Sequence, residues 1–312
     1  MPGTIAITGG SGFVGGHLVT HFLSRGWTVR ALSRRQGADL PGKGEIVCPG
    51  SLDDQEALKG LIEHADAVIH CAGLIKAEKR QDFFDVNRQA VDRFARLCAA
   101  SKPCRHFVHL STLAAREPAL SSYAASKLAG EKRVRAAPAL PWTIVRPPVI
   151  YGPGDRETVK LFRYMKRGLV LVPGALTARL SFVYIDDLCT ALTCLLSLPT
   201  GLQRVLDVHD GSPKGYDWRQ IAAAASQNLG HPVRAIPIPR AAAWPVAAMN
   251  ASLSRLFHTA PMLTPEKLRE AYHPDWVSAA NPLTQLTDWK PSVTILEGFG
   301  KSLQWYQQQG WL

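Results

Sequence analysis

The chain has 312 residues, of which 46% are hydrophobic and 20% are charged, as is typical of a folded globular protein. No apolar stretch is long enough to cross a bilayer, so we expect no integral membrane segment. The net charge of +11 favours anionic partners, but the basic residues form no long run and we expect no nucleic-acid binding. The 6 cysteines form no CxxC pair and show no metal spacing with histidine, which predicts no metal site and a cytoplasmic location.

In chain order, the first half of the sequence alternates short apolar runs with longer amphipathic stretches. The apolar runs predict strands at residues 4–8, 28–33, 45–48, 67–71, 107–111 and 142–146. The stretches between them predict helices near residues 12–24, 53–64, 82–100 and 121–136. Nearly unbroken apolar strands are typical of parallel sheets that helices cover on both faces. We therefore expect an α/β fold with a doubly wound parallel sheet, to which a helix at 186–198 and a strand at 204–208 could be added.

A glycine-rich turn, Thr8–Gly15, follows the first strand and opens the first helix. Its glycines allow a tight turn, close approach of the backbone to a pyrophosphate, and close packing of helix on strand. The start of the helix then offers backbone N–H groups and a partial positive charge to the phosphates. The pattern predicts a dinucleotide-binding Rossmann domain whose phosphate contacts are Gly9, Gly12, Phe13, Val14 and Gly15.

The end of the second strand indicates which dinucleotide is bound. A site that prefers NAD usually places an acid there to accept hydrogen bonds from the ribose. Here Ser33 stands near that position and is followed by Arg34 and Arg35. A guanidinium can pair with a 2′-phosphate, which a carboxylate would repel. We expect NADP as the cofactor, with NAD as the alternative.

Tyr123 and Lys127 lie four residues apart at the start of an alanine-rich helix and therefore point the same way. A phenol is a poor base at neutral pH, but a nearby ammonium stabilises the phenolate and brings its pKa towards the working range. Ser111 and Thr112 end the fifth strand, at the sheet edge where α/β folds bind ligands. These residues predict a proton-transfer site with Tyr123 as acid/base, Lys127 tuning it, and Thr112 or Ser111 donating to the substrate oxygen.

The second half is irregular and rich in proline. We expect a Rossmann domain of residues 1–150 plus about 181–210. A smaller, mostly helical substrate-binding domain would comprise about 151–180 plus 211–312. The apolar stretch at 240–257 predicts a buried helix of that second domain, although it could also line a substrate pocket or lie on a membrane surface.

These motifs together resemble the extended branch of the short-chain dehydrogenase/reductase superfamily, the NAD-dependent epimerase/dehydratase family. The resemblance runs from residue 1 to about 210. It is carried by TGGSGFVG (8–15), HCAG (70–73), DVN (85–87), LST (110–112), YAASK (123–127), RPPVIYGPGD (146–155) and FVYIDDL (182–188). It implies that Lys127 also bonds the nicotinamide ribose. Further cofactor contacts that it implies are Ser51, Leu52, Cys71, Ala72, Gly73, Asn87 and Pro147.

Departures from the family pattern narrow the function. Leu113 and Ala114 follow Thr112 where dehydratases carry Asp-Glu, so elimination of water is not expected. Val149 replaces the asparagine of many sugar-nucleotide members, and Ser51 replaces the acid near the adenine. We expect an NAD(P)-dependent oxidoreductase or epimerase that transfers hydride at a secondary alcohol or ketone of a small molecule. The alternatives are a nucleotide-sugar epimerase with tightly bound NAD and a non-catalytic dinucleotide-binding assembly or sensor protein. The chain could act as a homodimer, and the sequence leaves the substrate open.

Overall fold

The computed structural model describes residues 3–34, 45–101, 104–256, 264–278 and 282–312. The chain folds into two compact units. The first unit comprises Met1–Pro118, Ser122–Arg146 and Cys189–Leu206. The second comprises Ala119–Ser121, Pro147–Leu188 and Asp207–Leu312. Residues 119–121, 147–150, 181–188 and 207–210, which we expected in the Rossmann domain, therefore lie in the second unit. Within the described ranges, none of the helices is both long and apolar enough to cross a membrane.

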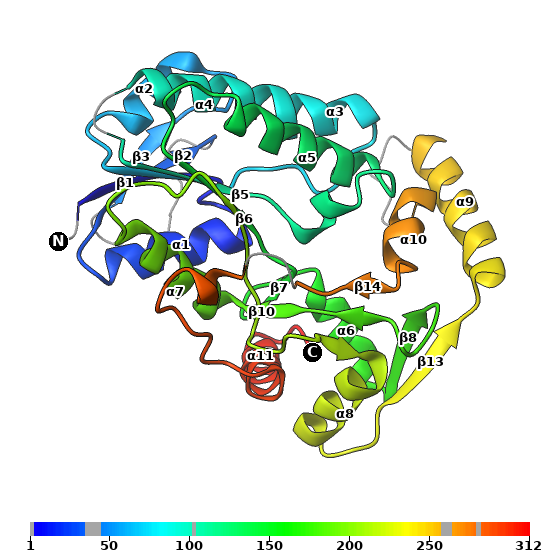
Figure 1. Cartoon of the computed structure of the whole chain (residues 1–312). Helices are drawn as coiled ribbons and strands as arrows, with labels where there is room; N and C mark the ends of the chain where they lie inside the picture. The colour runs from blue at the N-terminus through cyan, green and yellow to red at the C-terminus, as the bar shows by residue number, and fades with distance from the viewer. Residues whose placement is uncertain (1–2, 35–44, 102–103, 257–263, 279–281) are drawn as a thin grey trace. The chain divides into compact units, whose positions relative to one another are not determined.

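A seven-stranded sheet forms the centre of the first unit, in the order β11-β6-β5-β4-β1-β2-β3 (Figure 1). Its strands are β1 (Thr4–Thr8), β2 (Thr28–Ser33), β3 (Glu45–Pro49), β4 (Ala67–His70), β5 (His106–Leu110), β6 (Trp142–Arg146) and β11 (Val205–Asp207). The pairings from β3 through β2, β1, β4 and β5 to β6 are all parallel. The expected α/β fold with a doubly wound sheet is confirmed, and β11 is the added strand.

Helices cover both faces of this sheet, with α1 on one face and α2, α4 and α5 on the other (Figure 1). The bounds are α1 (Phe13–Leu23), α2 (Gln55–Ile62), α3 (Arg80–Phe84), α4 (Val91–Ala100), α5 (Ser122–Arg135) and α7 (Ile185–Leu196), with a 3₁₀ turn, η2, at Leu113–Arg116. Alternate strand residues Ala6, Val68 and Phe107 pack against Leu61 and Phe94 in one buried cluster. This packing fixes the register of the strands, and so places the ends of β1, β4 and β5 side by side.

The helix expected at 82–100 is interrupted by a π-helical segment, η1 (Asp85–Ala90). η1 packs against α5. A Cβ at Gly130 of α5 would lie 2.1 Å from the backbone oxygen of Asn87, so this close approach requires glycine. Short π segments often occur at functional positions.

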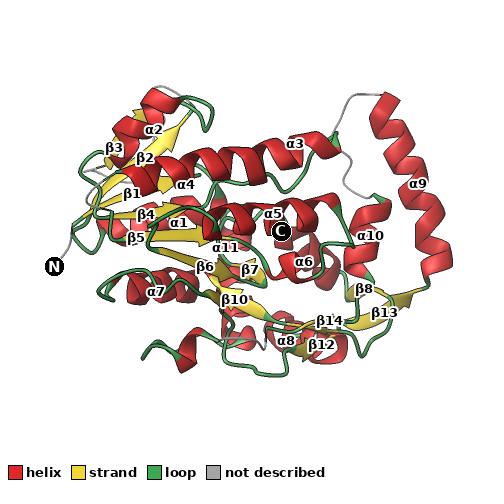
Figure 2. Ribbon diagram, turned by 45° about the horizontal axis from the view of Figure 1, so that its top comes forward, coloured by secondary structure: helices red, strands yellow, loops and turns green. Residues whose placement is uncertain are grey.

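The second unit combines short strands with longer helices (Figure 2). Its strands are β7 (Val149–Tyr151), β8 (Leu169–Pro173), β9 (Arg179–Leu180), β10 (Phe182–Tyr184), β12 (Tyr216–Asp217), β13 (Arg234–Ile238) and β14 (Asp275–Trp276). Its helices are α6 (Thr158–Lys166), α8 (Trp218–Leu229), α9 (Arg240–Leu256), α10 (Pro265–Ala271) and α11 (Ile295–Gln308), with a 3₁₀ turn, η3, at Leu283–Gln285. Buried aromatic rings of Tyr151, Phe162, Phe299 and Tyr306 meet edge to face or tilted in its core.

Helix α9 corrects one expectation. The apolar stretch at 240–257 does form a helix, but the side chains that the structure describes in it are not all buried: Trp244 is 36% exposed and Met249 is 61% exposed. Ala247 of the same helix is fully buried. Residue 257, the end of the stretch, lies outside the described residues. The composition of this segment suits a core, but its position leaves much of it on the surface.

Candidate active site

The glycine turn joins β1 to α1 in a shape that only small residues allow. Gly9 has φ +76°, and a Cβ there would lie 2.8 Å from the Ala72 nitrogen. A Cβ at Gly15 would lie 2.0 Å from the Gly9 oxygen. Gly12 is the N-cap of α1 and has no side chain that could bond the N–H groups of the first helical turn. That turn begins with Phe13 and Val14. The turn therefore has the open backbone and the helix end that a dinucleotide pyrophosphate requires.

A buried hydroxyl ties this turn to the neighbouring strand. The Thr8 Oγ1 accepts a hydrogen bond of 3.2 Å from the Ala72 N–H and lies 2.7 Å from His70 Nδ1. Thr8 and His70 are fully buried at the ends of β1 and β4. The loop that carries Cys71, Ala72 and Gly73 is thereby held against the glycine turn. The contact between His70 and Thr8 joins residues 62 positions apart, and no local sequence pattern indicates it.

The ends of β2 and β3 hold the residues expected at the adenosine side. Ser33 is buried, and its carbonyl accepts a 2.8 Å hydrogen bond from the Gly50 N–H. Arg34 follows it and is exposed to solvent, whereas Arg35 lies outside the described residues. Ser51 uses its hydroxyl to accept from the Asp53 N–H at 3.2 Å, and Leu52 is partly buried. Within the described residues, the structure records no ion pair of Arg34. An anionic group that binds at this edge would therefore meet an exposed guanidinium.

The Asn87 side chain joins the π segment to the loop after β4 and to α5. It is 1% exposed, and its carboxamide accepts from the Leu74 N–H at 2.8 Å and donates to the Leu74 oxygen at 2.9 Å. It also donates to Ser126 Oγ on α5 at 3.0 Å. A Cβ at Gly73 would lie 3.2 Å from Asn87 Oδ1 and 3.7 Å from Lys127 Nζ. The π segment, the loop after β4 and α5 thus converge here.

Tyr123 and Lys127 lie on one face of α5, as their spacing predicts. Lys127 is 5% exposed, and its ammonium donates a 2.8 Å hydrogen bond to the Leu110 oxygen at the carboxyl end of β5. Tyr123 is partly buried, with its ring centroid 6.3 Å from that of Phe83. Burial, which outweighs the attraction of Glu131 and of Cys71, lowers the pKa of Lys127 to about 8. Lys127 therefore begins to lose its proton at a pH that is only slightly above neutral.

The two hydroxyls after β5 differ in what they already contact. Ser111 is buried and donates a 2.6 Å hydrogen bond to Glu131 Oε1. Thr112 caps the short helix η2 by accepting from the Ala114 N–H at 3.2 Å, which leaves its own proton for another acceptor. Of the two, Thr112 has the geometry of a donor to a ligand.

Glu131 is a buried carboxylate that our sequence reading did not single out. Its side chain is fully buried and takes two hydrogen bonds from Arg146, of 2.8 Å and 2.7 Å, in addition to that of Ser111. Arg135 contributes a longer contact of 3.4 Å. The signal was present, since Glu131 lies four residues after Lys127 on the same helix face. These contacts join the second half of α5 to the ends of β5 and β6.

Behind the lysine lie His70 and His109, neighbours on β4 and β5 whose rings stack at 5.4 Å between centroids. Burial, and after it the charge of Lys127, lowers the pKa of His70 to about 3 and that of His109 well below its usual range. Burial also raises the pKa of the Cys71 thiol to about 12. These three side chains are therefore neutral at physiological pH, and Lys127 is the charged group they surround.

One further residue expected to contact the cofactor lies in the second unit. Pro147 follows Arg146 directly and belongs to the second unit. All six cysteines fall within the described ranges, and none of them forms a disulfide. Among the residues that the structure describes, no three histidine, cysteine or acidic side chains gather as a metal site would need.

The chain is similar to proteins of known family. Residues 5–206 match the model of the NAD dependent epimerase/dehydratase family. A ceramide reductase of Caulobacter vibrioides is 37% identical over 99% of this chain and 96% of its own length. A 3 beta-hydroxysteroid dehydrogenase/Delta 5-->4-isomerase of Mycobacterium tuberculosis is 26% identical over 97% of this chain and 90% of its own. Among solved structures, MoeE5 in complex with UDP-glucose and NAD is similar in fold, with a TM-score of 0.75, 20% identity, and coverage of 98% and 99%.

Proposed function

Because the chain belongs to the NAD-dependent epimerase/dehydratase family, we propose that it reduces the ketone of a ceramide-like lipid to a secondary alcohol. The observation that carries the proposal is the arrangement of Tyr123 and Lys127 on one face of α5, with the ammonium held at the carboxyl end of β5. The lipid class is supported by the ceramide reductase, whose similarity extends over nearly the whole of both chains. Val149 and the Leu113-Ala114 pair, which replace residues of sugar-nucleotide enzymes, point the same way.

The residues of the glycine turn fit a nicotinamide dinucleotide. The cradle formed by Gly9, Gly12 and Gly15 would be filled by any Cβ, and the start of α1 faces it with backbone N–H groups. A bound dinucleotide would supply hydride to the carbonyl carbon. Arg34, exposed after β2, favours the 2′-phosphate of NADP over the bare ribose of NAD.

The chain's own groups would handle the oxygen. The Tyr123 hydroxyl gives its proton to the carbonyl oxygen as negative charge develops there. The ammonium of Lys127 stabilises the resulting phenolate, which water then reprotonates. Thr112 donates a second hydrogen bond to the same oxygen, because its proton is not used by the Ala114 contact. Lys127 must be charged for this role, so we expect turnover to fall as the pH rises past about 8.

The test is reduction of 3-oxoceramide, dispersed in detergent, with NADPH or NADH. Cofactor oxidation is followed by absorbance and ceramide formation by mass spectrometry. We expect faster turnover with NADPH, and a loss of at least about 100-fold in kcat for Tyr123→Phe because general acid catalysis is removed. Tyr164→Phe, which removes the hydroxyl of an exposed tyrosine on α6, serves as the matched control and should keep full activity.

Three results would contradict the proposal. Unchanged turnover in Tyr123→Phe would remove that hydroxyl from the chemistry. Interconversion of UDP-glucose and UDP-galactose without added cofactor, together with NAD retained through purification, would indicate the epimerase instead. Bound dinucleotide with no reduction of 3-oxoceramide or of a panel of other ketones would indicate the non-catalytic binding protein.

A further inference from the structure

Large exposed apolar side chains gather on one part of the second unit. Strand β8 alternates, with Val170 and Val172 buried and Leu169 and Leu171 exposed. β13 pairs with it in parallel, so that Ile236 stands beside Leu171 on the exposed side. The sheet therefore presents apolar residues outward as well as inward, which a two-stranded sheet facing water would not need.

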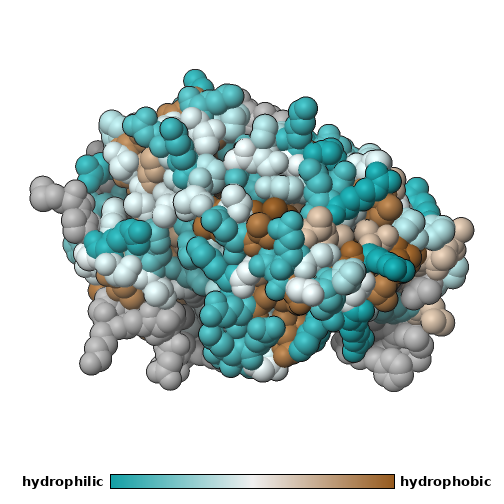
Figure 3. Space-filling view, turned by 90° about the horizontal axis from the view of Figure 1, so that it is seen from below, coloured by the Kyte–Doolittle hydropathy of each residue, from teal (hydrophilic) through white to brown (hydrophobic). Residues whose placement is uncertain are grey.

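Helix α9 continues this surface directly from β13. Trp244 is exposed and lies under the guanidinium of Arg240, 5.8 Å from ring centroid to charge. Met249, 61% exposed, is the most exposed large apolar side chain among those of the described residues. We call the set Leu169, Leu171, Ile236, Trp244 and Met249 the apolar face. In Figure 3, hydrophobic residues, in brown and tan, lie beside hydrophilic ones, in teal, on the right, the side where Figure 1 draws β8, β13 and α9.

The elements that carry the apolar face bear only basic charges, although the neighbouring helix α10 also holds Glu266 and Glu270. Residues 158–173, which form α6 and β8, and residues 234–256, which form β13 and α9, contain basic residues but no aspartate or glutamate. Lys166 and Arg167 immediately precede β8, and Arg234 stands opposite Leu169 in the paired strands. Arg240 begins α9. A cationic rim around exposed apolar side chains complements a surface that is anionic outside and apolar beneath.

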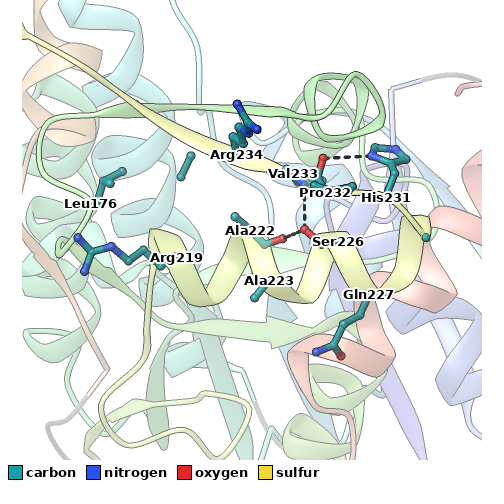
Figure 4. Close-up of a pocket in the computed structure, with 12 residues that line it drawn as sticks. Leu176, Arg219, Ala222, Ala223, Ser226, Gln227, His231, Pro232, Val233 and Arg234 are labelled. Atoms are coloured by element: carbon teal, nitrogen blue, oxygen red, sulfur yellow. Dashed lines mark hydrogen bonds between the residues drawn. The ribbon is translucent and has the colours of Figure 1, made fainter.

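An open groove of about 910 Å³ runs beside this region, between α8 and β13 (Figure 4). Ala222, Ala223 and Val233 give it an apolar lining, while Arg219 and Arg234 stand on its two sides. Ser226 does not add a free polar group, because it donates to the Ala222 oxygen and accepts from the Val233 N–H. The groove thus repeats the character of the apolar face, with aliphatic contacts inside and cations at the rim.

We propose that the apolar face docks on the surface of a membrane that contains anionic phospholipid, with α9 lying in the interface. Trp244 and Met249 would enter the boundary between headgroups and acyl chains, and Leu171 and Ile236 would rest against it. Arg167, Arg234 and Arg240 would remain at headgroup level, where lipid phosphates attract them. The occupant is a lipid surface and not an acidic protein, because a bilayer satisfies the exposed sheet face, the helix and the surrounding cations at once.

The experiment is sedimentation of the full chain with vesicles of phosphatidylglycerol mixed with phosphatidylcholine, in the absence of substrate and cofactor. We expect binding that weakens with salt and with removal of phosphatidylglycerol. Leu171→Glu and Met249→Glu should each lower the partition coefficient about tenfold, because each places a carboxylate at the acyl boundary. Leu296→Glu on α11 is the matched control, since Leu296 is 41% exposed and Leu171 is 42% exposed, and it should bind like the wild type.

Thermal melting of each variant shows that the fold is retained, as expected for exposed positions. Equal losses in all three variants, or no binding of the wild type to the anionic vesicles, would overturn the proposal. So would light scattering that shows a dimer disrupted by Met249→Glu, because the face would then be covered by a second copy of the chain. Vesicle binding requires no turnover, so its outcome is independent of the proposed reductase activity.

Discussion

The buried carboxylate of Glu131 gives a quantitative test of how the catalytic helix is held. In Glu131→Gln the side chain keeps its shape but loses its charge, so the buried end of Arg146 loses its counter-ion. Removing one partner of a buried pair usually costs about 3–5 kcal/mol, since the other charge stays desolvated. The glutamine oxygen can still accept one of the two Arg146 hydrogen bonds, which places the expected loss near the lower end, at about 3 kcal/mol.

The same substitution should also change the pH profile of activity. Burial lowers the pKa of Lys127, and the charge of Glu131 is the largest influence that raises it again. Without that charge the pKa of Lys127 falls further, so the ammonium loses its proton at lower pH. The alkaline limb of the activity profile therefore moves to lower pH. A merely structural role for Glu131 would lower stability without moving this limb.

Stability is measured by urea unfolding at neutral pH, and activity by the pH dependence of kcat in the reductase assay. Glu63→Gln is the matched control, because the Glu63 side chain is 63% exposed and should cost less than about 0.5 kcal/mol. A loss below about 1 kcal/mol for Glu131→Gln would refute the view that this carboxylate is a major counter-ion of the partly buried Arg146.

Three further predictions concern the same unit. The pKa of His70 is lowered to about 3 by burial and then by Lys127, whereas the unfolded value is 6.5, so the unfolded state binds the extra proton between these values. Stability should therefore rise with pH across that window by up to about 1.4 kcal/mol per pH unit, and urea unfolding of His70→Gln should show a shallower slope. Gly15→Ala should weaken NADPH binding at least about tenfold by calorimetry, because its Cβ would overlap the Gly9 oxygen. Gly60→Ala, which meets nothing within 4 Å, should leave binding unchanged, and equal affinities of the two variants would argue against the cradle. Arg34→Glu should lower the ratio of kcat/KM for NADPH to that for NADH about tenfold or more, and an unchanged ratio would remove Arg34 from cofactor choice.

Local patterns were sufficient for much of the fold and for part of the site. Each strand of the first six carries an apolar run long enough to mark it, and β1, β2 and β6 have the expected bounds. The four-residue spacing of Tyr123 and Lys127 likewise predicts one helix face, because helix geometry relates neighbours in sequence to neighbours in space. The glycine turn was readable because its glycines serve a backbone shape formed within eight residues.

The contacts that brace these residues join distant parts of the chain and leave little trace in a local pattern. Thr8 meets His70 across 62 residues, and Asn87 meets Ser126 across 39. Asn87 could be anticipated only as a cofactor contact, and the hydrogen bonds that occupy its carboxamide depend on where the loop after β4 runs. The exposure of α9 was missed for a related reason, since its apolar composition does not state what surrounds it.

The π segment at Asp85–Ala90 makes the number of residues in this stretch a constraint as strict as their identity. A π turn holds one residue more than an α-helical turn. Deleting one residue would let the segment close into a regular α-helical turn, and the wide turn that brings the Asn87 backbone oxygen against Gly130 of α5 would be lost. The contacts of Asn87 with Leu74 and Ser126 would then be disturbed, although every residue that makes them would still be present. Deletions and insertions of a single residue should be tolerated less here than substitutions at the exposed positions of the same segment.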